Sequence, residues 1–473
     1  MARINTNVGA MIAQRHLNAS FTKLNSTLER LSTGLRINHG KDDPAGLITS
    51  ERLRSEVKAV GQAISNTQRA SLIIATAEGA LDEVAALLRD IQAKVVEAAN
   101  EGAMSDDEIA ANQLQIDSAI ESITRIANST TFAGKHLLDG SLDYITSGVS
   151  PSAINALAIH GAQFGLRSFI PVEVEVAVSA QYGQLFWVGS TLASAVTIEV
   201  QGNLGVTTLS FSSGATIAQM VEAVNAVSDA TGVSATLSTG GFYMSSSELG
   251  SKQFVSVQSL PGGAQFQMQN AAGQEDKRDE GRDATATING ALSRGDGNHL
   301  TLKSSTLDIE LSLVRTFGIG TTSFAITEGG ALFQIGPQVN SNLQVNIGIQ
   351  SVAASRLGNA AVGYLSQIAS GQDFDLKTKR FQEAQQIIAE AVSQASVIRG
   401  RLGAFERNTL DTNRNQLGIT MENLAASESQ IRDADFAYET SQLTRNQVLV
   451  NSSTAALTMA NQTPQMVLRL LGG

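Results

Sequence analysis

The chain has 473 residues and a formal net charge of −11, from 33 Lys and Arg against 44 Asp and Glu. The length suits about three domains, the acidic balance argues against nucleic acid as a partner, and the absence of cysteine excludes disulfides and thiolate metal sites. Met1–Ala10 lacks the apolar core of a secretory signal, and no apolar run approaches the ~18 residues of a membrane span. We therefore expect no cleaved signal peptide and no membrane insertion.

An apolar stripe runs through the N-terminal part of the chain. Its members are spaced four, three, four, three and four residues apart, which is the pattern of a coiled-coil seam. They are Leu17, Phe21, Leu24, Leu28, Leu31 and Leu35. Gly34 and Gly40 interrupt the stripe, and Asp43 can cap a new helix that has Pro44 in its first turn.

The helix after Pro44 is predicted to continue to about Asn100. Its apolar stripe is expected at Ile73, Ala77, Ala80, Val84, Leu87 and Ile91. Ser105 and Glu108 form a capping box that opens a third helix, with an apolar face at Ile109, Ile116, Ile120 and Ile123.

The C-terminal part repeats this style. Ala395, Ile398, Leu402 and Phe405 are spaced three, four and three residues apart, and the same count then reaches the polar residues Thr409, Thr412 and Gln416. Farther on, four apolar residues recur every seven positions: Phe436, Leu443, Val450 and Leu457. Heptad-like stripes at both ends indicate that the termini pair with each other and with neighbouring chains.

The middle, from about Asp139 to Asn340, is predicted to be β-rich. Val172–Val178 and Val196–Val200 alternate with period two, as half-buried strands do. Residues 216–227 read as a short amphipathic helix, and Glu275–Glu280 as a solvated loop. The expected fold class is α+β, with a long antiparallel helical bundle or coiled coil from both termini and an inserted β-rich outer domain.

Several motifs at the two ends resemble those of bacterial flagellins. The N-terminal ones are Ile4–Asn7, Leu31–Asn38, Asp42–Leu47, Ile126–Lys135 and Leu138–Gly140, and the C-terminal ones are Ile431–Ala437, Ala460–Gln462 and Pro464–Leu468. A weaker resemblance, to the insertion repeat of flagellins and hook-associated proteins, lies at Thr231–Ala235, Gly250–Ser251 and Ile288–Gly290, where Gly232 and Gly290 are expected to serve turns.

The resemblance implies a layered, extracellular structural subunit that polymerises into the flagellar filament, the propeller of swimming motility. The expected layers are an inner coiled coil of residues 1–42 and 432–473, a second helical layer of 43–140 and 345–431, and a variable outer domain of 141–344. The expected partners are other copies of the chain, an export chaperone at the C-terminus, the filament cap, hook-associated junction proteins and the type III export apparatus. No cofactor is expected.

The resemblance also points to a surface that has changed. Flagellins sensed by the host flagellin receptor carry a stretch close to Gln-Arg-Val-Arg-Glu-Leu-Ala-Val, where this chain has Arg89–Val96. Asp90, Gln92 and Lys94 replace two arginines and a leucine, so weak recognition is expected. On an exposed helix face Asp90 is also expected to pair with Lys94 at i+4.

Three other readings are possible. A hook–filament junction protein shares the helical core, and a secreted adhesin could place a β-rich head on a helical stalk. An enzyme is disfavoured because no convergent acid, base or nucleophile is evident, and none of the five histidines lies four residues from another as in a zinc-protease motif. Regular filaments in electron micrographs of the purified protein would separate a filament subunit from an adhesin.

Overall fold

The computed structural model describes residues 6–165, 167–260, 266–270, 273–304 and 306–471. Within them the chain forms two compact units. The first comprises Met1–Gln68, Ile335–Val339 and Thr409–Gly473, and the second comprises Arg69–Gln334 and Asn340–Asn408. Ile4 and Asn5 of the first flagellin-like motif lie outside the described residues.

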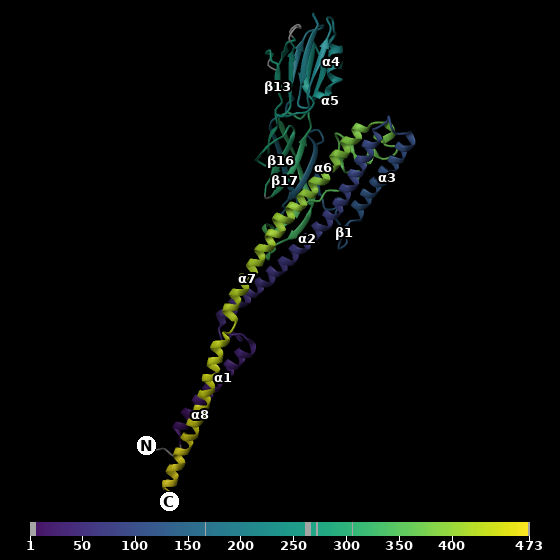
Figure 1. Ribbon diagram of the computed structural model, residues 1–473. Helices are drawn as coiled ribbons and strands as arrows, with labels where there is room; N and C mark the ends of the chain where they lie inside the picture. Colours follow the sequence, from purple (N-terminus) through teal and green to yellow (C-terminus); the bar gives the residue numbers. More distant parts are fainter. Residues whose placement is uncertain (1–5, 166, 261–265, 271–272, 305, 472–473) are drawn as a thin grey trace. The chain divides into compact units, whose positions relative to one another are not determined.

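The first unit is helical. Helix α1 (Val8–Thr33) lies antiparallel against α8 (Phe436–Leu471), as Figure 1 shows. Helix α7 (Thr412–Arg432) packs on the first part of α2 (Pro44–Ala98) through a small cluster that contains Val60, Ala63 and Leu417. Apolar burial between the helices of this unit therefore lies along narrow seams.

The loop between α1 and α2 is compact. Gly34 ends α1 in the left-handed conformation (φ 73°), which favours glycine. Ile37 is almost fully buried, and a Cβ on Gly46 would crowd the Asp43 carboxylate and lie 2.7 Å from the Ile37 Cδ1 atom, so a larger residue there would have to displace these side chains. The predicted cap is confirmed, because Asp43 Oδ1 accepts a 2.9 Å hydrogen bond from the Gly46 amide.

In the second unit, the later part of α2 joins α3 (Asp106–Ser129) and α6 (Phe381–Phe405). The capping box of Ser105 and Glu108 is present, and the predicted isoleucine face of α3 is buried. The predicted stripe of α2 was partly wrong. Its fully buried members include Ile74, Leu81 and Leu88 in place of their predicted neighbours one position earlier, alongside Ala77, Val84 and Ile91.

A π-helical segment, η4 (Glu406–Asp411), joins α6 to α7. Buried residues are seven apart before it, at Ala395 and Leu402, and seven apart after it, at Leu410 and Leu417. The step across the segment is eight residues, because a π turn takes in one extra residue. The prediction that the seam becomes polar was therefore wrong, since the count from Phe405 was one residue out of phase.

Two closed β cores form the middle of the chain. The first lies between the sheets β15-β14-β5-β18-β3 and β16-β17-β4. Its strands are β3 (Tyr144–Ser147), β4 (Ile154–Ala162), β5 (Ile170–Val178), β14 (Thr285–Ile288), β15 (Ala291–Arg294), β16 (His299–Lys303), β17 (Leu307–Leu313) and β18 (Gly320–Gly329). Val172, Val174 and Val176 alternate into this core, as predicted.

The second core lies between the sheets β12-β6-β10-β9 and β13-β11-β7-β8, with α4 (Ile217–Asn225) packed against it. Its strands are β6 (Gln184–Val188), β7 (Val196–Gln201), β8 (Val206–Phe211), β9 (Val233–Ser238), β10 (Gly241–Ser246), β11 (Phe254–Ser259), β12 (Met268–Gln269) and β13 (Arg278–Glu280). The predicted helix and the strand at Val196 are confirmed. The solvated loop is corrected in part, because Arg278–Glu280 pairs with β11 and Arg278 stacks on the Phe254 ring.

Short elements complete the chain. They are α5 (Ser228–Thr231), β1 (Thr131–Phe132), β2 (Lys135–His136), β19 (Ala331–Gln334), β20 (Gln344–Ile347), β21 (Gly358–Asn359), β22 (Gly363–Tyr364), η1 (Ser341–Leu343), η2 (Leu365–Ile368) and η3 (Leu376–Thr378). Gly232 and Gly290 both have positive φ, as their predicted turns require. The predicted class, helical termini around a β-rich middle, is confirmed.

Candidate assembly interface

The face that α1 turns to α8 is lined by seven of the buried and half-buried residues of the helix; Ser26, Glu29 and Arg30 are half-buried as well. The spacing of the seven is three, four, three, four, three and four, and they are Ala10, Ala13, Leu17, Ser20, Leu24, Thr27 and Leu31. Every seventh position is a leucine, and the positions between them are small or polar. We call these residues the α1 seam.

The facing surface of α8 has the same periodicity. Seven of its buried and half-buried residues form the α8 seam: Glu439, Leu443, Asn446, Val450, Ser453, Leu457 and Ala460; Gln442 is half-buried as well. Apolar and polar residues alternate here too. Glu439 is only 3% exposed and Asn446 is 5% exposed, so the polar members are as deeply placed as the apolar ones.

Polar contacts join the two seams. Arg30 Nη1 lies 3.2 Å from Glu439 Oε1, and Asn446 Nδ2 donates a 3.1 Å hydrogen bond to Thr27 Oγ1. Within the described residues, the second carboxylate oxygen of Glu439 is buried without a hydrogen-bond partner. A buried carboxylate held by a single cation is costly to leave unpaired, so Arg30 is tied to its place.

A backbone bridge closes the base of the hairpin at Leu35 and Asp433. The Arg36 amide donates to the Arg432 carbonyl at 2.7 Å, and the Ala434 amide donates to the Gly34 carbonyl at 2.8 Å. These bonds join the loop after α1 to the connection between α7 and α8.

The structure brings together six of the ten residues predicted for coiled-coil packing. They are Leu17, Leu24, Leu31, Leu443, Val450 and Leu457. Phe21 and Leu28 lie outside the α1 seam, 44% and 46% exposed, and Phe436 is 69% exposed at the start of α8. Leu35 lies beyond the end of α1, in the backbone bridge.

The sequence reasoning missed the polar half of the interface. Ser20, Thr27, Glu439, Asn446 and Ser453 occupy seam positions, and the heptad spacing contained them once small and polar residues were allowed at alternate positions. The apolar residues left outside the seams give the hairpin an outer surface. The exposed large ones are Val8, Met11, Ile12, Phe21, Leu28, Phe436, Tyr438, Val448, Leu449, Met459 and Met466.

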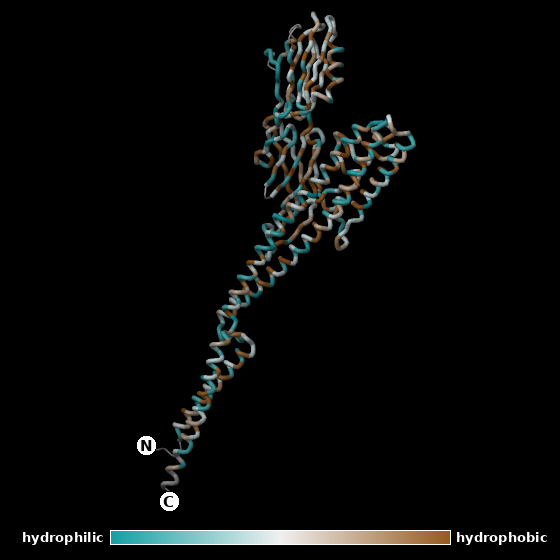
Figure 2. Tube along the Cα trace, in the orientation of Figure 1, coloured by the Kyte–Doolittle hydropathy of each residue, from teal (hydrophilic) through white to brown (hydrophobic). Residues whose placement is uncertain are grey.

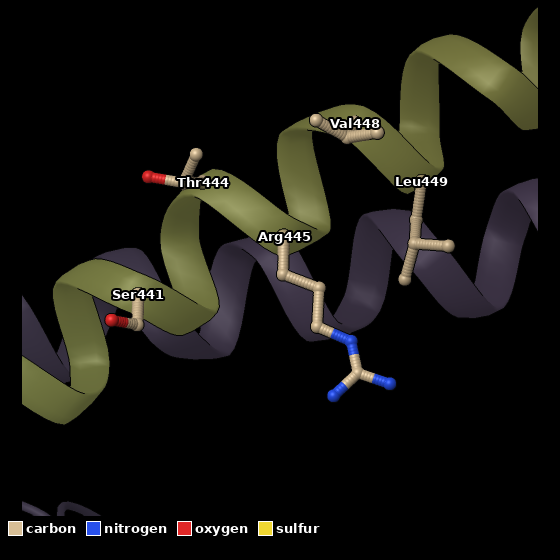
Figure 3. A pocket seen from close by; sticks show the side chains of 5 residues that line it. All are labelled: Ser441, Thr444, Arg445, Val448 and Leu449. Atoms are coloured by element: carbon tan, nitrogen blue, oxygen red, sulfur yellow. The ribbon is translucent and has the colours of Figure 1, made fainter.

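One part of this outer surface is hollowed. The hollow is shallow and open, and Figure 3 shows the five α8 residues that line it: Ser441, Thr444, Arg445, Val448 and Leu449. Two of these side chains are apolar, and the Arg445 side chain extends away from the α8 ribbon. An apolar side chain with a polar neighbour would fit such a surface.

The altered stretch on α2 is partly exposed. Arg89 and Asp90 are exposed, and Gln92 and Lys94 are half-buried. The expected pairing of Asp90 with Lys94 was wrong, because Lys94 Nζ lies 2.9 Å from Glu97 Oε2 instead. The hydrogen bond from Lys94 holds the pKa of Glu97 below its ordinary value.

The described residues contain no group of three or more His, Cys, Asp or Glu that could hold a metal ion. In the same part of the chain, no helix is long and apolar enough to cross a membrane. Figure 2 agrees, since hydrophilic and hydrophobic residues are mixed along α1 and α8.

The chain is similar to known proteins along its whole length. Residues 4–143 match the family described as the bacterial flagellin N-terminal helical region, and residues 385–471 match the bacterial flagellin C-terminal helical region. Residues 195–248 match the flagellin hook IN motif. That match covers Thr231–Ala235 of the weaker resemblance and leaves out its other two segments.

Among curated relatives, the B-type flagellin of Pseudomonas aeruginosa is 30% identical over 524 aligned positions, covering 99% of each chain. Flagellin E of Vibrio cholerae is 29% identical, covering 99% of this chain and 98% of that one. Among solved structures, FliC from Burkholderia pseudomallei is 16% identical with a TM-score of 0.23, covering 72% of this chain and 99% of its own. Flagellar hook-associated protein-3 from Legionella pneumophila is 12% identical with a TM-score of 0.31, covering 80% and 98%.

Proposed function

This chain belongs to the flagellin family and is a structural subunit of the extracellular bacterial flagellar filament rather than an enzyme, and we propose that the outer surface of its α1–α8 hairpin carries the contacts between subunits. The observation that supports this surface is the set of apolar side chains that the seams leave outside. Large apolar groups gathered on a narrow helical hairpin indicate a protein partner, and a filament subunit has its own copies as neighbours.

Phe21 and Leu28 are the α1 residues that we assign to this contact. Both keep more than two fifths of their surface exposed, and they lie seven residues apart, so they share one helix face. On α8 the hollow at Val448 and Leu449 is a place where such a side chain of a second copy could sit. A contact between unlike surfaces, knob to hollow, builds a helical polymer when its rotation does not close into a ring.

We also propose the layered arrangement that the family implies. Residues 1–42 and 432–473 would form the inner coiled coil, 43–140 and 345–431 the second layer, and 141–344 the outer domain. The Leu35–Asp433 bridge supports the boundary between the inner and second layers, because it joins the N-terminal and C-terminal segments close to residues 42 and 432. The two closed β cores support an outer domain that folds by itself.

The route to the filament is a further proposal. The subunit would leave the cell through the type III export apparatus, held beforehand by an export chaperone on α8, and would assemble under the filament cap beyond the hook-associated junction proteins. The many exposed apolar residues of α8 support a helix-in-groove chaperone complex.

We propose that the host flagellin receptor recognises this subunit weakly. Asp90 stands exposed where recognised flagellins carry an arginine, and it offers only acceptors to receptor groups that an arginine would satisfy. Lys94 is already engaged by Glu97. The surface at residues 89–96 therefore differs from that of recognised flagellins in its charge and in its hydrogen-bond donors.

Electron microscopy of the purified chain tests the assembly surface. The native protein should form filaments of one helical lattice, and a chain truncated before Phe436 should remain monomeric, because it lacks α8. Filaments of normal lattice from the truncated chain would show that the contacts lie elsewhere.

A further inference from the structure

The two α1 residues that make polar contacts with α8 are followed back along the sequence by two residues of the same kind, seven positions earlier. In the structure, the hydroxyl that accepts from Asn446 is Thr27, and the cation beside Glu439 is Arg30. Seven residues earlier stand Ser20, another hydroxyl, and Lys23, another cation, and a leucine follows each cation. One heptad of α1 therefore repeats the chemistry of the next.

This repeat makes the seams compatible with a second register. Residues seven apart lie on nearly the same face of a helix in a two-stranded seam. Sliding α1 along α8 by one heptad, about 10.5 Å at 1.5 Å per residue, would carry Ser20 to Asn446 and Lys23 to Glu439. It would also bring Leu17 and Leu24 to the places of Leu24 and Leu31, while Ala10 would take the place of Leu17. A second slide fails, because the next heptad has Ala13 in place of the hydroxyl.

The backbone bridge has no such copy. The residue seven positions before Leu35 is Leu28, which lies inside α1. The bridge uses the Arg36 amide and the Gly34 carbonyl. Their counterparts seven residues earlier, the Glu29 amide and the Thr27 carbonyl, are used by the helix itself, so they could not form the bridge. The two hydrogen bonds at Gly34 and Arg36 exist in one register only.

We propose that the α1–α8 hairpin has two side-chain-compatible registers one heptad apart, and that the Leu35–Asp433 backbone bridge, not the helix seam, selects the one observed. The loop of residues 34–43 would take up the displacement of α1. The bridge is thus the positioning element of the hairpin, and Arg36 and Ala434 supply its donors.

Cysteine pairs can read the register, because the native chain has no cysteine. Ser20→Cys with Ser453→Cys is the heptad equivalent of the Thr27–Asn446 contact and reports the observed register. Ala13→Cys with Ser453→Cys reports the register displaced by one heptad. Each double-cysteine variant is copolymerised with a tenfold excess of the same variant without cysteines, so that disulfides form within one subunit. Mass spectrometry then measures the fraction of subunits that carry the disulfide.

The first arm removes one of the two hydrogen bonds of the bridge together with the observed polar contacts. Ala434→Pro deletes one donor and suits the preceding Asp433, whose φ of −75° and ψ of 148° are those preferred before proline. With Thr27→Ala and Arg30→Gln added, the displaced pair should crosslink at least tenfold more than in the control that carries Ala434→Ser, which keeps the donor. Crosslinking of the observed pair alone would overturn the proposal, as would loss of both crosslinks.

The second arm keeps the bridge intact and removes only Thr27 and Arg30 contacts, by Thr27→Ala with Arg30→Gln. The observed pair should still crosslink, and the displaced pair should not, because the bridge alone holds the register. Crosslinking of the displaced pair in this variant would show that the seam side chains select the register and would refute the assignment to the bridge.

Discussion

Leu28→Asp separates the contacts within the hairpin from those between subunits. Leu28 lies on α1 outside the seam and is 46% exposed, so the substitution leaves the contacts of Leu24 and Thr27 with α8 in place. Burying a whole leucine side chain stabilises by roughly 1.5–3 kcal/mol. The half that a neighbouring subunit would cover is therefore worth about 1 kcal/mol, or about fivefold in critical concentration.

Replacing this leucine with aspartate costs more than the lost apolar contact. A carboxylate placed in an apolar contact without a partner adds a penalty of several kcal/mol. We expect Leu28→Ala to raise the critical concentration for polymerisation about fivefold and Leu28→Asp to raise it at least a hundredfold. Sedimentation of polymer at graded subunit concentrations measures both.

The matched control is Asn25→Asp, which adds the same charge to an exposed polar position of α1. It should change the critical concentration less than twofold, since surface charges interact weakly in salt. If Leu28→Asp polymerises as readily as Asn25→Asp, the outer surface of α1 does not carry a subunit contact.

Three further predictions address other parts of the chain. Removing about residues 150–335 and joining the ends with a short linker should preserve filaments in electron micrographs, because that region holds the whole second β core and all of the first except β3; soluble monomer without polymer would mean that the β region is structural. Truncation after Asp433 should abolish binding of the export chaperone in calorimetry, because it removes α8; unchanged binding would place the chaperone site elsewhere. In a receptor-reporter assay the native subunit should signal weakly and Asp90→Arg with Lys94→Leu should signal more strongly; strong signalling by the native protein contradicts the reasoning, and the single change Lys94→Leu controls for loss of the Glu97 pair.

The heptad leucines were predictable, and their polar partners were not sought. Leu17, Leu24 and Leu31 recur every seven residues and do occupy the seam. The intermediate positions were assigned to Phe21 and Leu28 because apolar side chains were assumed to point inward. A seam between two helices remains close to water along both edges, so small and polar residues such as Ser20 and Thr27 are tolerated there.

The connection between α6 and α7 shows a second reason why the sequence did not predict every buried residue. Counting by threes and fours from Phe405 loses the apolar seam, although Leu410 and Leu417 continue it. The π turn at Glu406–Asp411 adds one residue to the spacing, and the residue types in this segment do not predict a π turn. The alternating strands were easier, because a period of two over Val172–Val178 has no helical explanation.

The composition of the seams connects folding with assembly. Thr27 is the single fully buried residue of α1 among those described, and two of the three fully buried α8 seam residues are the polar Glu439 and Asn446. Polar side chains at such positions lower the stability of a helix pair, and isolated helices are themselves marginal. If the proposed contacts hold, the hairpin would gain little from its own seam and most from neighbours that cover Phe21, Leu28 and the hollow on α8. Such a subunit would then become fully ordered only where neighbouring copies are already in place, as at the end of a growing polymer.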